Sequence, residues 1–318
     1  MFLLPICYTS ISRTYCPFVM EVFMLHMYGC PIHLGVGDTG LIRSLAYLNA
    51  HYPNLQFPLI PEIKKEEEGL LQLKNLNSVA ATCESIASYG YEVLSKGDTP
   101  LFIAGDHSAA MGSVSASSVY TRRTSGGDTG LLWIDAHPDI NTDETTVTGN
   151  IHGMPVAALL GMGEKRLTHF LDEQPKLKPE NIIMIGLRDI DPPEKVFLDQ
   201  LHIRYYTWGA VRAKGLSQCL TEIIGRFSHL SAVHISFDID SMDPELIPGV
   251  SVPVPGGFNL AEVMEMFRTL LPALPVIACD IVEFNVAHDK MDRTADFVSE
   301  LVSLIHELYE SSADFRSF

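Results

Sequence analysis

Two acidic clusters lie far apart in the sequence, and each follows an apolar run typical of a buried strand, at residues 130–134 and 232–237. The clusters consist of Asp135, His137 and Asp139 and of Asp238 and Asp240. In extended chain, side chains two residues apart point to the same side. Four carboxylates that converge repel one another unless cations lie between them. The clusters therefore predict a site for two divalent cations, which would balance the four charges.

His107 follows a third apolar run, at residues 101–104, and is a further candidate ligand. A single Asp after a strand is usually an Asx turn or a helix cap. The combination of both clusters with His107 would rarely arise from capping alone. Its many oxygens and few imidazoles favour Mn2+, Mg2+ or Co2+ over a structural zinc. A pair of such ions typically activates water for hydrolysis at neutral pH.

Two residues outside the clusters are candidates for acid–base and cation-binding roles. His152 lies between small residues near a chain turn, which suits a mobile proton carrier, although a surface histidine is the alternative. Glu283 follows the apolar run that ends at Asp280 and could hold a cation, although a salt bridge or a cap is the alternative. His234 lies inside an apolar run, so we expect a core histidine there.

Apolar, β-rich runs alternate with segments of helical period along the chain. Strands are expected near residues 22–28, 101–104, 130–134, 181–185, 204–206, 233–237 and 276–280. Helices are expected from about residue 41 and over 78–95, 216–227, 259–270 and 294–310. This alternation predicts an α/β fold with a mostly parallel sheet and helices on both faces. Ligands of such sheets bind beyond the carboxyl ends of the strands, where both clusters are expected. Pro248 to Gly257 must form an ordered loop beside them.

The composition limits the classes of partner. The chain has 318 residues, of which 47% are hydrophobic and 19% charged, and a net charge of −17. This charge argues against binding nucleic acid or an acidic membrane and favours a small cationic substrate. Scattered cysteines without a C-x-x-C pair indicate a reducing, cytoplasmic compartment, and no stretch is long enough to span a bilayer. We expect an N-terminal extension over 1–23 and a single catalytic domain over 24–318.

The motifs resemble those of the ureohydrolase superfamily, and within it those of arginases. The shared motifs are Gly105-Asp-His-Ser108, Asp135-Ala-His-Pro-Asp139, Ser236-Phe-Asp-Ile-Asp-Ser-Met-Asp-Pro244 and the late Glu283. Two stretches look like arginase rather than agmatinase, namely 139–155 and 185–194. The resemblance covers most of the chain. It implies a three-layer α/β/α fold of the arginase/deacetylase type and the hydrolysis of L-arginine to L-ornithine and urea.

The resemblance also implies a role for each motif residue, with two manganese ions per subunit. The first ion would be held by His107, Asp135, Asp139 and Asp238. The second would be held by Asp135, His137, Asp238 and Asp240. Glu283 would bind the guanidinium, His152 would protonate the leaving amine, and Asp139 would orient the attacking water. Asn141 and Thr148 would bind the α-carboxylate, and Asp191 and Glu194 the α-amino group.

Other functions stay open at this point. Agmatinase or another guanidino or amidino hydrolase is the nearest alternative, because Val252 stands where many arginases have a threonine. A non-catalytic regulatory relative is remote, because no metal-ligand position is lost. A single-metal deacetylase of similar fold would not need both the first acidic cluster and the 139–155 stretch. The resemblance implies a homo-oligomer, as a trimer or hexamer.

Overall fold

One parallel sheet of seven strands organises the chain. The computed structural model describes residues 24–67 and 72–316, so the predicted extension over 1–23 lies outside the described residues. The strands are β1 (Leu25–Cys30), β2 (Thr99–Ala104), β3 (Thr129–Ile134), β4 (Ile182–Leu187), β5 (Arg204–Thr207), β6 (Ala232–Asp238) and β7 (Val276–Val282). Their order in the sheet is β1-β2-β7-β6-β3-β4-β5, and every neighbouring pair is parallel. The strands predicted from sequence are confirmed, with ends that shift by a few residues.

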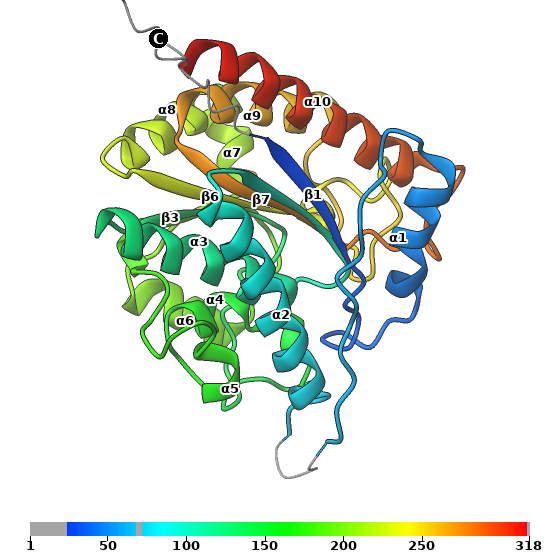
Figure 1. The fold of residues 1–318 in the computed structure, drawn as a ribbon, viewed down its shortest axis with the longest axis vertical. Helices are drawn as coiled ribbons and strands as arrows, with labels where there is room; N and C mark the ends of the chain where they lie inside the picture. The colour runs from blue at the N-terminus through cyan, green and yellow to red at the C-terminus, as the bar shows by residue number, and fades with distance from the viewer. Residues whose placement is uncertain (1–23, 68–71, 317–318) are drawn as a thin grey trace, which may run out of the picture.

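Helices cover both faces of the sheet, as the alternating pattern predicts (Figure 1). One face carries α2 (Leu76–Ser95), α3 (Ala109–Ser125), α4 (Pro155–Leu159), α5 (Lys165–Thr168) and α6 (Pro192–Gln200). The other face carries α1 (Gly40–His51), α7 (Trp208–Lys214), α8 (Leu216–Phe227), α9 (Leu260–Ala273) and α10 (Arg293–Arg316). Short 3-10 turns are η1 (Ile151–Gly153), η2 (Pro179–Asn181) and η3 (Ile239–Ser241). The result is the predicted single α/β domain of three layers.

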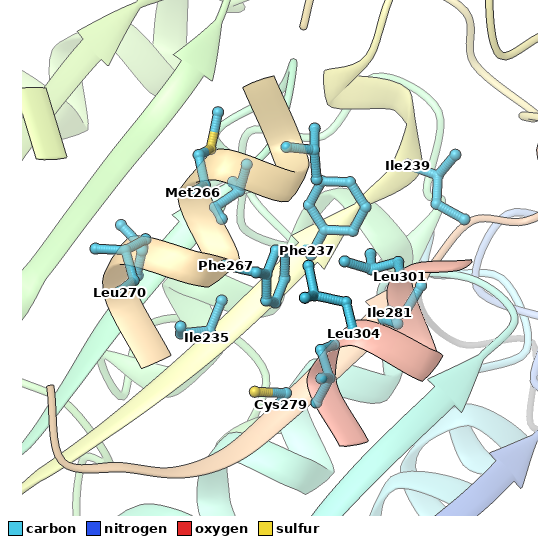
Figure 2. Close-up of a cluster of buried hydrophobic side chains, with 14 of the residues drawn as sticks. Ile235, Phe237, Ile239, Met266, Phe267, Leu270, Cys279, Ile281, Leu301 and Leu304 are labelled. Carbon is cyan, nitrogen blue, oxygen red and sulfur yellow. The ribbon is translucent and has the colours of Figure 1, made fainter. Parts of the chain in front are cut away.

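The central strands are fixed by packing on α9 and α10, as Figure 2 shows. Phe237 of β6 meets Phe267 of α9 edge to face, with ring centroids 5.8 Å apart and an interplanar angle of 85°. Alternate residues of β6 point to the other face, where His234 is fully buried. Its Nδ1 lies 2.9 Å from Ser117 Oγ and its Nε2 lies 3.0 Å from Asp280 Oδ2. The predicted core histidine is confirmed.

The carboxyl ends of β2, β7, β6 and β3 lie side by side, because these strands are adjacent and parallel. The segments that follow these four strands carry the residues singled out in the sequence. Gly105, directly after β2, makes the closest approach, since a Cβ atom there would lie 1.7 Å from Ile32 O. The backbone of Glu283 donates to Gly105 O at 2.7 Å, which joins the ends of β2 and β7. Only glycine allows the approach to Ile32, and the backbone bond to Glu283 brings that residue next to His107.

The structure bears on membrane spans and on the cysteines. Among the described residues, no helix combines the length and the apolarity that crossing a bilayer requires. The four cysteines in these residues are buried and free, namely Cys30, Cys83, Cys219 and Cys279. The cysteines described by the structure therefore form no disulfide framework.

Candidate active site

His107 faces three carboxylates with a single ring nitrogen. Its Nδ1 lies 3.0 Å from Asp135 Oδ2, 3.0 Å from Asp238 Oδ2 and 3.3 Å from Asp139 Oδ2. None of these contacts has hydrogen-bond geometry, and the nitrogen is completely buried. An imidazole nitrogen carries at most one proton, so it cannot satisfy three carboxylates. A cation between these atoms satisfies all four groups at once.

The opposite side of the His107 ring fixes its tautomer. Nε2 lies 2.9 Å from Ser236 Oγ, and the Ser236 hydroxyl donates its proton to Asp280 Oδ2 at 3.3 Å. Since that proton is already committed, Nε2–H must be the donor to Ser236. The ring also stacks on Trp133, with centroids 3.8 Å apart and planes within 4°. Nδ1 therefore presents a lone pair to the carboxylates, which is the form that binds metals.

A second group of ligand atoms shares Asp135 with the first. His137 Nδ1 lies 3.0 Å from Asp240 Oδ2 and 3.5 Å from Asp135 Oδ1. The structure thus brings potential ligand atoms together in two sets, each within the span of one ion, and Asp135 belongs to both. Five of the six predicted metal residues belong to these sets, and Asp238 adjoins the first through its 3.0 Å contact with His107 Nδ1. Asp135 has the position expected of a bridging ligand.

The turn role of the aspartates and a ligand role coexist. Asp135 Oδ1 accepts a hydrogen bond from His137 N at 2.7 Å, and Asp238 Oδ1 accepts one from Asp240 N at 2.7 Å. These are Asx turns, which are the usual structural role of an Asp after a strand. In each residue the other oxygen faces His107. The turns therefore hold the carboxylates in place for the cluster.

The cluster is electrostatically unbalanced without cations. Burial raises the pKa of Asp238 well above its ordinary value, and the charges of Asp240 and Asp135 raise it further. Burial and the charge of Asp135 likewise raise the pKa of Asp139. Asp139 also adopts a left-handed backbone with φ of 47°, a conformation that costs a non-glycine residue about 1–3 kcal/mol. Divalent cations would remove this repulsion, so the residues fit a two-metal centre.

Glu283 and His152 meet beside the cluster. Glu283 Oε1 accepts a hydrogen bond from His107 N at 3.0 Å and lies 3.3 Å from His152 Nδ1. Its other oxygen, Oε2, is buried without a hydrogen-bond partner. Burial lowers the pKa of His152, but the hydrogen bond and the charge of Glu283 outweigh this and raise it to about 9. His152 is thus positioned as a protonated donor, and Glu283 Oε2 as an acceptor for a cationic group.

A pocket of about 370 Å³ opens onto these groups, a volume typical of small-molecule sites. All but two of the residues predicted for the site line it. The two exceptions, His107 and Asp135, are completely buried and belong to the metal cluster. One small molecule in the pocket could therefore contact the cluster, Glu283 and His152 together.

The side of the pocket predicted to bind the amino acid end is built around Asn141. Its Nδ2 donates to Asp191 Oδ2 at 3.2 Å, and its Oδ1 accepts from Thr145 Oγ1 at 2.9 Å. Thr145 Oγ1 in turn accepts from Thr142 N at 2.9 Å, so its only proton goes to Asn141. This arrangement orients the Asn141 amide with its NH2 group toward Asp191. Donors to an anion are therefore available at this end.

Glu194 also has a structural role, which its place in the sequence does not indicate. Its Oε1 accepts from Ile140 N at 3.1 Å and its Oε2 accepts from Asp191 N at 3.0 Å, which completes a capping box at the start of α6. Burial raises the pKa of Glu194 to about 8, against the lowering effect of these backbone bonds. Glu194 therefore joins the Asn141 segment to Asp191, besides lining the pocket.

The sequence analysis missed several pocket residues, namely Thr146, Val147, Asn150 and Asp189. Thr146 and Val147 lie in a loop directly before the predicted Thr148, and all three line the pocket, so no strand period in the sequence indicates them. Arg188 belongs to the 185–194 stretch but does not line the pocket. Its side chain bonds to the backbone after β6, at Asp240 O and Met242 O. No spacing in the sequence indicates that contact.

Comparisons with known proteins agree with this geometry. The model of the Arginase family matches residues 39–306. Arginase from Bacillus caldovelox is 35% identical over 272 residues, which cover 85% of this chain and 88% of that protein. Its native crystal structure at pH 5.6 superposes with a TM-score of 0.80 at 31% identity and covers 89% of this chain and 98% of its own. Entamoeba histolytica arginase in complex with L-ornithine gives a TM-score of 0.78 at 27% identity, with coverage of 89% and 98%.

Proposed function

Because the chain belongs to the arginase family of hydrolases, we propose that it cleaves the guanidinium group of L-arginine to give L-ornithine and urea. The observation that carries this proposal is the pocket itself. It combines a two-cation cluster, a buried carboxylate with one free oxygen, a protonated histidine and a polar end suited to an amino acid. A solved relative bound to L-ornithine supports the same reading.

We propose manganese as the metal, at two ions per chain. His107, Asp135, Asp139 and Asp238 would hold one ion, and Asp135, His137, Asp238 and Asp240 would hold the other. Oxygen-rich sets with few imidazoles suit manganese. When bound, the ions would balance the carboxylates and supply an activated water at neutral pH. Asp139 lies beside His107 and Asp135, where its carboxylate could orient that water.

Glu283 and His152 would act on the guanidinium end of the substrate. A guanidinium is planar and cationic, and it pairs with carboxylates through directed hydrogen bonds. The free Oε2 of Glu283 is the buried acceptor that it needs. His152, charged at neutral pH because of Glu283, would give its Nδ1 or Nε2 proton to the leaving nitrogen. The departing amine would leave as ornithine.

Residues at the far end of the pocket would select an amino acid. The Asn141 amide and the Thr148 hydroxyl would donate to the α-carboxylate, whereas Asp191 and Glu194 would accept from the α-ammonium, partly through water. Since Asn141 donates to Asp191 in this structure, substrate binding would replace that bond with one from Asn141 to the α-carboxylate and one from the α-ammonium to Asp191. One charge-assisted bond would thus be replaced by two, which favours a zwitterionic end. We also propose a cytoplasmic homo-oligomer.

A substrate panel tests the proposal. Manganese-loaded protein is expected to release urea from L-arginine with a kcat/KM at least about a hundredfold higher than from agmatine, which lacks the α-carboxylate. Losing the hydrogen bonds of one charged group costs roughly 1.5–3 kcal/mol each, and about 1.4 kcal/mol corresponds to tenfold. Urea is measured directly, with chelator-treated protein as the control. Equal or faster turnover of agmatine would assign the chain to the agmatinase activity instead.

A further inference from the structure

Arg188 makes an unusual set of contacts beside the active site. The two N–H groups of Nη2 are shared among Asp240 O at 2.7 Å, Met242 O at 3.0 Å and Val254 O at 3.1 Å. Nη1 donates to Ser241 O at 3.1 Å and Gly186 O at 3.4 Å, and Nε donates to Pro255 O at 3.3 Å. Every one of these partners is a backbone carbonyl. The guanidinium thus uses its N–H groups to hold backbone segments together.

The carbonyls belong to segments that come from distant parts of the sequence. Gly186 lies in β4, two residues before Arg188. Asp240 and Ser241 end η3 and Met242 caps it, where a short helix leaves its last carbonyls without partners of its own. Val254 and Pro255 lie in the 248–257 loop, whose Val252 lines the pocket. Arg188 therefore connects the turn that carries Asp240 to the loop that carries Val252.

The loop depends on this connection more than the turn does. Pro253 and Pro255 have no N–H groups, which limits the backbone bonds that the loop can form. Among the described residues, 252–257 take part in only two hydrogen bonds. Arg188 donates both, to Val254 O and to Pro255 O. Without Arg188, these carbonyls would be left to solvent. The wall of the pocket at Val252 would then lose its anchor.

We propose that Arg188 is a positioning residue that couples the metal-ligand turn at Asp240 to the substrate wall at Val252. Arg188 does not line the pocket, so it acts through these two segments. The inference rests on the proposed function only for its kinetic readout, since the structural coupling stands on the contacts themselves. Lysine cannot replace it, because one ammonium with three protons cannot reach carbonyls of both segments in the planar fork of a guanidinium.

Arg188→Lys and Arg188→Gln test the proposal, with Arg226→Lys on the exposed face of α8 as the matched control. Both Arg188 variants are expected to raise the KM for arginine roughly tenfold, with a smaller change in kcat, and to weaken Mn2+ binding by a similar factor, because several charge-assisted bonds are lost. Hydrogen exchange of the amides of Asp243 and Phe258, which bond the turn to the end of the loop, is expected to accelerate about tenfold, while exchange in β3 and β6 stays unchanged. Arg226→Lys is expected to behave like the wild type.

Three results would overturn the proposal. The first is an unchanged KM and unchanged exchange of the Asp243 and Phe258 amides in both Arg188 variants. The second is faster exchange throughout the sheet, or loss of the folded state in both variants, since Arg188 would then serve the whole fold. The third is a change in KM without a change in Mn2+ affinity, since the two segments would then be uncoupled. If the wild type released no urea from arginine, the proposed function would fail, but the exchange and Mn2+ measurements would still decide the role of Arg188.

Discussion

Asp135→Asn is expected to lower urea release at least about a hundredfold and to abolish retention of two metal ions. Asp135 is completely buried and belongs to both sets of ligand atoms. Asparagine keeps the size of the side chain and the Asx turn to His137 N, so the change removes mainly a charge. Removing one partner from a buried charged group costs about 3–5 kcal/mol, and each 1.4 kcal/mol is about tenfold. Urea release and metal content of the purified protein are the two measurements.

The control for Asp135→Asn lies at the opposite end of the same strand. Asp128 precedes β3, is exposed and pairs with Lys178 at 2.7 Å. Asp128→Asn makes the same chemical change far from the pocket, where exposed ion pairs contribute about 0–1 kcal/mol. It should leave metal content and urea release close to those of the wild type. An Asp135→Asn protein with normal activity and two bound ions would show that the metal assignment is wrong.

His152→Asn is expected to lower kcat for arginine about 100- to 10,000-fold with a small change in KM, because general acids contribute this much. His152 is protonated below its pKa of about 9, so the rate that depends on its proton is lost as the pH rises through that value. In the variant, this alkaline decline of kcat should disappear. The measurement is the pH profile of kcat for both proteins.

His229→Asn provides the matched control for His152, because His229 is an exposed histidine after α8. Its pH profile should superpose on that of the wild type. The contact at 3.3 Å between His152 Nδ1 and Glu283 Oε1 raises the pKa of His152, so the protonated state of His152 depends on Glu283. A fall of less than tenfold in kcat for His152→Asn would remove His152 from the proposed role. An alkaline decline that persisted in the variant would have to come from another group.

Much of the fold follows from the sequence because its signals are local. Runs such as Gly130 to Ile134 are apolar throughout, which is typical of strands buried on both faces, and β3 is indeed buried along its whole length. Parallel strands align their carboxyl ends at one edge, so residues after β2, β3, β6 and β7 could be expected to meet. The order of the strands in the sheet could not be predicted, because it depends on long-range packing such as that between Phe237 and Phe267.

The sequence predicts the site residues at strand ends well, because the sheet sets their positions. It predicts less of the residues that are held by contacts between loops. Asp135 directly follows β3 and Asp238 is the last residue of β6, so their positions are set by the sheet. Glu283 owes its orientation to a left-handed backbone with φ of 68°, which glycine favours and which the sequence does not signal. Glu194 closes a capping box whose motif precedes no long apolar run, and its bond to Ile140 N is a long-range contact.

The central claim is that the chain releases urea from arginine at a centre of two cations. The most direct measurement titrates Mn2+ into metal-free protein and follows bound metal, urea and ornithine together. We predict no turnover without metal, full activity at two ions per chain, and urea and ornithine in equal amounts. Full urea release in the presence of a strong chelator, or saturation of activity at one ion per chain, would contradict the account.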